Sequence, residues 1–296
     1  MGYDENDQEA QARVTALRRQ LDDLGWREGS NVTIEARWIA GNTERMDAAA
    51  ADLARLNPAV IVGATTGVLR ALLRHTRTIP IVFLSVSDPV GDGFVASLAS
   101  PGGNATGFTN LERSLGGKWV QILQEIAPPL KRAAALFNPA TSADRGGYYG
   151  GPFKTAAATL GIEPVERPAH ATAEIDGIVA SLAGDPPGGL IVMPDVFTVV
   201  NRQRIIAAAQ THRVPAIYPY KYFVADGGLA AYGIDLFDQY RRAAVYVDRI
   251  FRGESPATLP VQGPAKFDLA VNLKTAKGLG LAIPPTFLAR VDEVIE

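Results

Sequence analysis

The chain has 296 residues, more than one domain usually holds, so its length favours two domains, although one long domain stays open. With 29 basic and 31 acidic residues its formal net charge is −2, and it lacks the basic excess expected of a nucleic-acid-binding protein. The absence of cysteine excludes disulfides and thiol chemistry. Only three histidines occur, far apart in the sequence, so we expect no metal site and no cofactor. No apolar run is long enough to span a membrane.

Strand and helix patterns alternate along the first third of the chain. Residues 6–24 place apolar side chains every three or four positions, which predicts an amphipathic helix. Residues 32–38 alternate apolar and polar side chains, which predicts a half-buried strand. Three short apolar runs predict buried strands of a parallel sheet, at 59–62, 79–84 and 105–108. Further helices are predicted near 46–56, 67–76 and 91–99.

A second series of the same kind follows. Its predicted strands are 132–137, 162–166, 189–193, 214–218 and 228–233. Its predicted helices are 112–126, one after Pro152, 172–183 and 199–212, and the chain ends with a long helix at 235–252, a strand at 267–273 and a short helix.

Two βα series predict an α/β fold with two doubly wound parallel-sheet lobes. We assign residues 1–111 and 231–256 to the N-terminal lobe, and 112–230 and 257–296 to the C-terminal lobe. Several crossings between lobes favour a hinge-closing motion over free tumbling of the lobes.

Polar residues follow the predicted strands of the first series, where open parallel sheets bind ligands. Thr65 and Thr66 follow one strand, and Ser85, Ser87 and Asp88 follow the next. The two threonines and Ser87 are candidates for binding a carboxylate, because a helix N-terminus adds free N–H donors and a positive dipole end. The same residue types are favoured helix caps in any protein, which is the alternative interpretation.

The strand ends of the second series are richer in aromatic residues. Tyrosine and phenylalanine offer stiff surfaces for a planar ligand, and a carboxylate there could take a ligand ammonium or hydroxyl. The alternative is a tyrosine-rich core edge with aspartates as helix caps. The candidates are Asn138, Asp195, Phe197, Tyr218, Tyr220, Tyr232 and Asp235.

Signatures of enzymes are absent from the sequence. It has no phosphate-binding loop of the G-x-x-x-x-G-K-[ST] type and no G-x-S-x-G elbow, and the glycines of residues 102–107 lack the dinucleotide-binding spacing. His75 and His212 fall at predicted helix C-terminal ends, where histidine interacts with the helix dipole, so neither is a candidate catalytic base. An α/β enzyme using Asp88 or Asp195 as its base would need a paired acid that the sequence does not offer.

Three long blocks carry a resemblance to a known family. They read LDDLGWREGSNVTIEARWIAGNTERM, IPIVFLSVSDPVGDGFVASLASPGGNATGFTN and DRIFRGESPATLPVQGPAKFDLAVNLKTAKGLGLAIPPTFLARVDEVIE. Together they resemble the ABC-transporter substrate-binding proteins related to tryptophan and tyrosine importers. The resemblance spans nearly the whole chain. It implies a periplasmic-binding-protein type I fold with a Venus-flytrap closing motion, and it places the candidate residues named above around the interlobe cleft.

The resemblance also implies a function. We expect a monomeric periplasmic or membrane-tethered protein that captures a small molecule, delivers it to an ABC permease and catalyses no reaction. Aromatic amino acids or related carboxylates are the favoured ligands, while purines and other small molecules stay open. The alternative is a ligand-sensing module of the same fold, although no signalling domain is attached.

The start of the chain departs from the family pattern. The resemblance implies a signal segment and a first β-strand directly before MGYDEND, and neither is in this sequence. We expect a misplaced start or a truncation, which would leave an unfilled slot in the first sheet. With that strand restored, Tyr3 and Asp4 would stand at its carboxyl end as ligand contacts.

Overall fold

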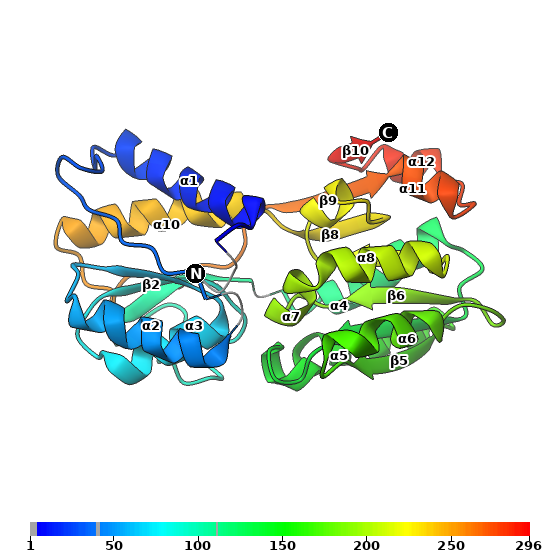
Figure 1. The fold of residues 1–296 in the computed structure, drawn as a ribbon, viewed down its shortest axis with the longest axis horizontal. Coiled ribbons are helices and arrows are strands. Elements are labelled where there is room, and N and C mark those ends of the chain that lie inside the picture. The colour runs from blue at the N-terminus through cyan, green and yellow to red at the C-terminus, as the bar shows by residue number, and fades with distance from the viewer. Residues whose placement is uncertain (1–4, 40–41, 111) are drawn as a thin grey trace. The chain divides into compact units, whose positions relative to one another are not determined.

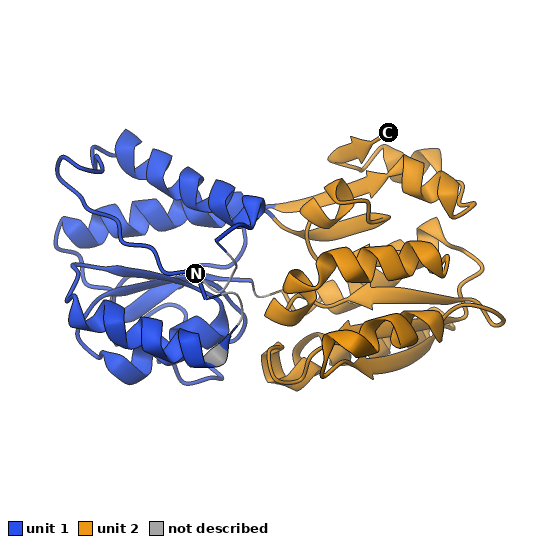
Figure 2. Ribbon diagram, in the orientation of Figure 1, with its two compact units in different colours: residues 1–111, 235–266 blue, residues 112–234, 267–296 orange. Residues whose placement is uncertain are grey.

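The computed structural model describes residues 5–39, 42–110 and 112–296. The chain divides into two compact units, coloured separately in Figure 2. Unit 1 consists of Met1–Leu111 and Asp235–Lys266, and unit 2 of Glu112–Ile234 and Phe267–Glu296. Among the helices of the described residues, none combines the length and apolar character needed to span a bilayer.

Two boundaries of the units differ from those expected from the sequence. Residues 231–234 lie in unit 2, because they belong to a strand that pairs within its sheet. Residues 257–266 lie in unit 1, where the Val261 N–H donates to the Leu98 carbonyl (2.7 Å) and the Gln262 N–H donates to the Gly107 carbonyl (2.9 Å). The chain therefore passes between units after residues 111, 234 and 266.

The sheet of unit 1 is parallel and has the order β1-β2-β3 in the described residues. Its strands are β1 Ile61–Ala64, β2 Ile81–Val86 and β3 Ala105–Thr109. Its helices are α1 Gln8–Asp23, α2 Thr43–Arg55, α3 Thr66–His75 and α10 Leu236–Phe251. Helices α1 and α10 lie side by side over one face of the sheet, and α2 and α3 pack together on the other (Figure 1). Both faces are covered, which explains why every residue of β2 and β3 is buried.

Two elements expected in unit 1 are not formed. Residues 32–38 keep some of the predicted alternation in burial but are not a strand, because no described strand pairs with them and only Val32 makes a bridge, with Glu28. Residues 91–99 form turns and bends instead of a helix. Two glycines and the Asp88 cap of the turn that precedes them favour turns over a helix there. Tyr3 and Asp4, the ligand contacts predicted at the start of the chain, lie outside the described residues.

Unit 2 contains a seven-stranded sheet with the order β10-β9-β8-β7-β6-β4-β5. Only β8 and β9 pair antiparallel, and the other neighbours are parallel. Its strands are β4 Arg132–Phe137, β5 Glu163–Pro168, β6 Gly188–Val192, β7 Ala216–Tyr218, β8 Ala230–Ile234, β9 Phe267–Asn272 and β10 Glu293–Ile295.

The helices of unit 2 pack as two pairs, α4 with α5 and α6 with α8. The strand order and right-handed crossovers place these pairs on opposite faces of the sheet. The helices are α4 Leu115–Ile126, α5 Gly147–Thr159, α6 Ile175–Ala180, α7 Val196–Val200, α8 Arg202–Thr211, α9 Tyr222–Ala225, α11 Leu273–Gly278 and α12 Pro285–Leu288. Helix α5 begins before Pro152 and continues through it, and the Tyr148 carbonyl, which the proline cannot bond, accepts the Arg113 Nε–H at 3.4 Å.

Candidate functional site

The end of β1 in unit 1 is built on a residue in an unusual backbone conformation. Thr65 caps α3 with φ at +89°, and its hydroxyl oxygen accepts the Val68 N–H at 3.4 Å. Its own N–H donates to the Leu84 carbonyl of β2 (2.9 Å), which holds the two strand ends together. A threonine at positive φ is strained by its branched side chain, and such strain gathers where a site over-determines the backbone.

The end of β2 carries a β-bulge. Phe83 pairs with Gly107 and Val86 pairs with Thr109, so β2 advances by three residues while β3 advances by two. Ser85 lies inside the bulge with φ at +53°. Bulges redirect the side chains that follow them, so this one sets the direction of Ser87 and Asp88.

The hydroxyls predicted in unit 1 lie together at these two strand ends. The Thr66 hydroxyl oxygen accepts the Ser87 N–H at 3.4 Å, which joins the start of α3 to the residues after β2. Ser87 is buried, and within the described residues neither its hydroxyl proton nor that of Thr66 has an acceptor. Asp88 accepts the Gly91 N–H at 2.8 Å through Oδ1 and is partly exposed. The structure thus brings Thr65, Thr66, Ser87 and Asp88 to one edge of the unit 1 sheet.

Ser85 and Asp235 have protein partners instead. The Ser85 hydroxyl donates to Gln239 at 3.0 Å. Asp235 caps α10 by accepting the Asp238 N–H at 3.1 Å, and its other oxygen lies 3.5 Å from the Lys266 ammonium. Asp235 is therefore a helix cap, the alternative that its sequence position left open.

In unit 2 the carboxylate of Asp195 connects two strand ends. It caps α7, which follows β6, and accepts the Thr198 N–H at 2.8 Å. It also accepts the Asn138 N–H (2.9 Å) and the Thr141 hydroxyl (3.2 Å) from the loop after β4. Both of its oxygens are thus engaged by protein donors, so Asp195 and Asn138 lie together as predicted, but the carboxylate ties two loops to each other.

The environment of Asp195 changes its protonation. Burial raises the pKa of the Asp195 carboxyl to about 6, against the lowering effect of the hydrogen bonds from Asn138, Thr198, Thr141 and Phe197. The charged form is therefore disfavoured by desolvation although it is well hydrogen-bonded.

The tyrosines after β7 form a stacked aromatic cluster in unit 2. Tyr218 stacks on Phe223 with ring centroids 5.2 Å apart, and Tyr220 stacks on Tyr222 at 5.5 Å. Tyr218 is 1% exposed, and burial raises the pKa of its phenol well above its ordinary range. Tyr218 thus lies in the core and Tyr220 near its edge, at 7% exposure. Phe197 and Tyr232 are more open, and Tyr232 stacks on Phe267 at 6.0 Å.

Sequence reasoning missed two aromatic residues near this cluster. Tyr148 and Tyr149 open α5 after β4, packed edge to face at 4.9 Å. Burial raises the pKa of Tyr149 well above its usual value, with further contributions from Tyr220, Tyr148 and Glu112, so it lies close to Tyr220. Helix α4 approaches closely through Gly116, where an added Cβ would overlap the Tyr149 carbonyl. The signal in the sequence was a pair of adjacent tyrosines flanked by glycines at residues 146–151.

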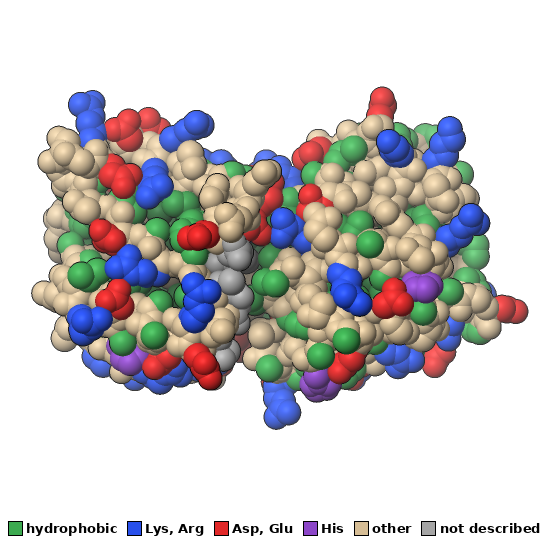
Figure 3. All heavy atoms as spheres, in the orientation of Figure 1, with side chains coloured by type: hydrophobic (Ala, Val, Ile, Leu, Met, Phe, Trp, Pro, Cys, Tyr) green, Lys and Arg blue, Asp and Glu red, His purple; other side chains and the backbone are tan. Residues whose placement is uncertain are grey.

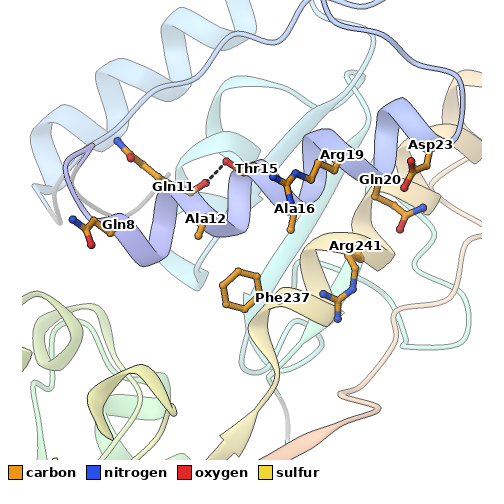
Figure 4. A pocket seen from close by; sticks show the side chains of 10 residues that line it. All are labelled: Gln8, Gln11, Ala12, Thr15, Ala16, Arg19, Gln20, Asp23, Phe237 and Arg241. Atoms are coloured by element: carbon orange, nitrogen blue, oxygen red, sulfur yellow. Dashed lines mark hydrogen bonds between the residues drawn. The ribbon is translucent and has the colours of Figure 1, made fainter. Parts of the chain in front are cut away.

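A surface groove runs along α1 and α10 of unit 1 (Figure 4). Most of its lining residues are polar, and the lining includes Phe237 and Arg241 from α10, of which Arg241 lies 3.6 Å from the Asp235 carboxylate. None of the predicted site residues lines it. Charged side chains of both signs are interspersed on the face of the molecule drawn in Figure 3. In the part of the chain that the structure describes, no group of three or more histidines and carboxylates could hold a metal ion.

Comparison with known proteins assigns the family. The model of the family described as ABC transporter substrate binding protein matches residues 7–295. The chain belongs to this family. As a family member it is a substrate-binding protein of an ABC transporter, and the resemblance seen in the sequence is confirmed.

Individual relatives agree with the family assignment. A curated tyrosine-binding protein of Clostridioides difficile (strain R20291) is 24% identical over 267 residues, which cover 89% of this chain and 75% of the relative. A conserved domain protein from Vibrio cholerae is 30% identical, with a TM-score of 0.88 and coverage of 96% of this chain and 94% of the other. A domain from Streptococcus pneumonia solved with L-Trp is 22% identical, with a TM-score of 0.88 and coverage of 96% and 95%. The α/β type I periplasmic-binding-protein fold is therefore confirmed.

Proposed function

We propose that this chain is the ligand-capturing component of an ABC importer that binds an aromatic amino acid outside the cytoplasm and delivers it, unchanged, to a membrane permease. The observation that carries the proposal is the chemistry of the strand ends. Unit 1 offers hydroxyls and a helix start suited to a carboxylate, and unit 2 offers aromatic rings. The relatives named for tyrosine and solved with L-Trp support the same ligand class.

The carboxylate of the ligand is assigned to unit 1. The hydroxyl protons of Thr66 and Ser87 have no acceptor among the described residues, and the first turn of α3 supplies backbone N–H donors beside them. Such donors and the helix dipole together favour an anionic group. Asp88 has one oxygen that accepts no hydrogen bond in the described residues, and it is our candidate partner for the ligand ammonium.

The aromatic ring of the ligand is assigned to unit 2. Phe197 and Tyr232 are the partly exposed members of the predicted aromatic set, and they present ring faces that the core tyrosines do not. Offset or edge stacking on such rings contributes beyond the area buried. Tyr220 and Tyr149 are buried in the same unit, so we assign neither as the main contact of the ligand ring.

Calorimetric titration with a matched ligand series tests the proposal. L-Tyrosine and L-tryptophan should bind, tyramine, which lacks the carboxylate, should bind at least about a hundredfold more weakly, and L-leucine, which lacks the ring, should also bind weakly. A saturating ligand at 100 times its Kd should stabilise the protein by about 2.7 kcal/mol. Chromatography should recover the ligand unchanged. Equal affinity for tyramine and L-tyrosine, or no binding of either aromatic amino acid, would refute the assignment.

A further inference from the structure

Gln239 is a fully buried polar side chain next to the unit 1 strand ends. It lies on α10 and is 1% exposed. Its Oε1 accepts the Ser85 hydroxyl at 3.0 Å, and its Nε2 donates to the Thr109 carbonyl at 2.9 Å. A buried amide with both ends engaged is costly to rearrange, since moving either partner leaves a buried polar group unsatisfied.

One end of the amide holds the bulge of β2. Ser85 needs its positive φ of +53° to form the bulge, and its hydroxyl is fixed in that conformation by Gln239. Two residues later, the Ser87 N–H contacts the hydroxyl oxygen of Thr66. The position of the proposed carboxylate donors therefore depends on a backbone conformation that Gln239 stabilises.

The other end of the amide reaches the segment before the first crossing between units. Thr109, whose carbonyl accepts from Gln239, stands two residues before Leu111, the last residue of the first stretch of unit 1. The next residue, Asn110, donates its N–H to the Val86 carbonyl of the bulged strand at 3.2 Å. The bulge and the first crossing segment are thus held to the same side chain and to each other.

Helix α10 extends these contacts to the other two crossing segments. The Gln239 N–H donates at 3.4 Å to the carbonyl of Asp235, the first residue of unit 1 after the second crossing. Asp235 in turn donates its N–H to the Lys266 carbonyl at 3.1 Å, and Lys266 is the last residue before the third crossing. All of these contacts lie within unit 1.

We propose that Gln239 is a positioning residue that couples ligand binding at the β2 bulge to the three segments where the chain passes between units. The proposal rests on the proposed function. A ligand that contacts Ser87 and Thr66 selects one conformation of the bulge, and the amide imposes the matching conformation on Thr109 and on the start of α10. Coupling of this kind requires that both ends share one two-state element, and the proposal assigns that role to the bulge with its buried amide.

Two substitutions of Gln239 and one control test the proposal. Gln239→Met keeps a similar volume and removes both hydrogen bonds, while Gln239→Glu keeps an acceptor for Ser85 and removes the donor to Thr109. Tyr246→Phe is the control, because Tyr246 is also buried on α10, and its hydroxyl donates to the Pro260 carbonyl at 2.6 Å and hydrogen-bonds the Gln262 side chain. This substitution removes the hydrogen bonds of another buried side chain on the same helix, and neither of its partners is a residue of the bulge.

The first readout is hydrogen exchange of the ligand-free proteins. Gln239→Met and Ser85→Ala should each speed exchange of the Ser87 and Asn110 amides together, and Tyr246→Phe should not. Unchanged Asn110 exchange in Ser85→Ala would overturn the coupling, whatever ligand the protein binds. This result separates failure of the coupling from failure of the proposed function, which the titration of wild-type protein decides alone.

The second readout is ligand binding. Gln239→Met should lower the affinity for L-tyrosine about tenfold and abolish the ligand-induced protection of the amides at 109–110 and 235–239. Gln239→Glu should keep the protection at Ser87 and lose it at Asn110. Two results would overturn the inference by showing that Gln239 has a purely structural role. One is weaker binding by Gln239→Met with wild-type protection at all of these amides, and the other is an equal loss of protection in Tyr246→Phe.

Discussion

The strand ends of the two units share a topology but differ in how they use their polar groups. In unit 1, Thr65 and Ser85 are held at positive φ, and Ser87 keeps an unused hydroxyl proton within the described residues. In unit 2, both carboxylate oxygens of Asp195 accept hydrogen bonds from protein donors, and the residue caps a helix. In unit 1 the strained backbone of Thr65 and Ser85 therefore lies beside hydroxyl donors that a ligand could use. In unit 2 the Asp195 carboxylate instead stabilises the fold.

The largest expected effect comes from removing the carboxylate of unit 2. Asp195→Ala leaves the N–H groups of Asn138 and Thr198 and the Thr141 hydroxyl without their acceptor. We expect the free energy of unfolding to fall by about 4 kcal/mol at pH 5, measured by urea denaturation. Asp88→Ala in unit 1 is the control, because Asp88 makes one hydrogen bond from a partly exposed position, and its loss should cost less than about 1 kcal/mol. Equal losses in the two variants would contradict the comparison.

A smaller effect is expected from pH. Since burial raises the pKa of Asp195 to about 6, the folded protein holds a proton that the unfolded chain, with a carboxyl pKa near 3.8, has released. The contribution of this group to stability is therefore lost as pH rises from about 4 through 6. The difference in unfolding free energy between wild type and Asp195→Ala should be about 1 kcal/mol smaller at pH 7 than at pH 5. A difference that grows over this range would show that the hydrogen bonds outweigh desolvation.

The smallest change in stability is expected in unit 1. Thr65→Gly relieves the strain of φ at +89° and loses only a long cap hydrogen bond of 3.4 Å. The protein should be unchanged or up to about 1 kcal/mol more stable, while the affinity for L-tyrosine falls about tenfold, because the donors beside α3 lose their fixed direction. Thermal denaturation and titration of the same sample measure both. A clear loss of stability would show that Thr65 stabilises the fold of unit 1, as Asp195 stabilises that of unit 2.

Individual strands show which sequence patterns predict secondary structure correctly and which do not. Short continuous apolar runs predicted buried strands correctly, as at 132–137, since strands covered on both faces leave this pattern. The alternating pattern at 32–38 led to a wrong prediction, because alternation states only that a segment could be a half-buried strand. A strand forms only where another strand supplies hydrogen bonds, which residues local in sequence cannot reveal.

The candidate site divides in the same way. Strand ends and helix starts are local features, so Thr65, Thr66 and Ser87 were found from the sequence and lie at one edge of the unit 1 sheet. Gln239 could not be found, because it meets Ser85 across 154 residues and nothing in a helical glutamine shows which strand it will face.

The sequence by itself therefore determined the family, through the resemblance of its long blocks to known members, and the α/β class and the types of residue that end each strand, through short-range periodicity. Only the tertiary structure decided what each polar side chain does. The Asp195 carboxylate joins two loops through hydrogen bonds, and the buried Gln239 amide joins Ser85 to Thr109. Both outcomes depend on burial and on partners brought together by the fold, which fix whether a polar group is satisfied by the protein or left for a ligand.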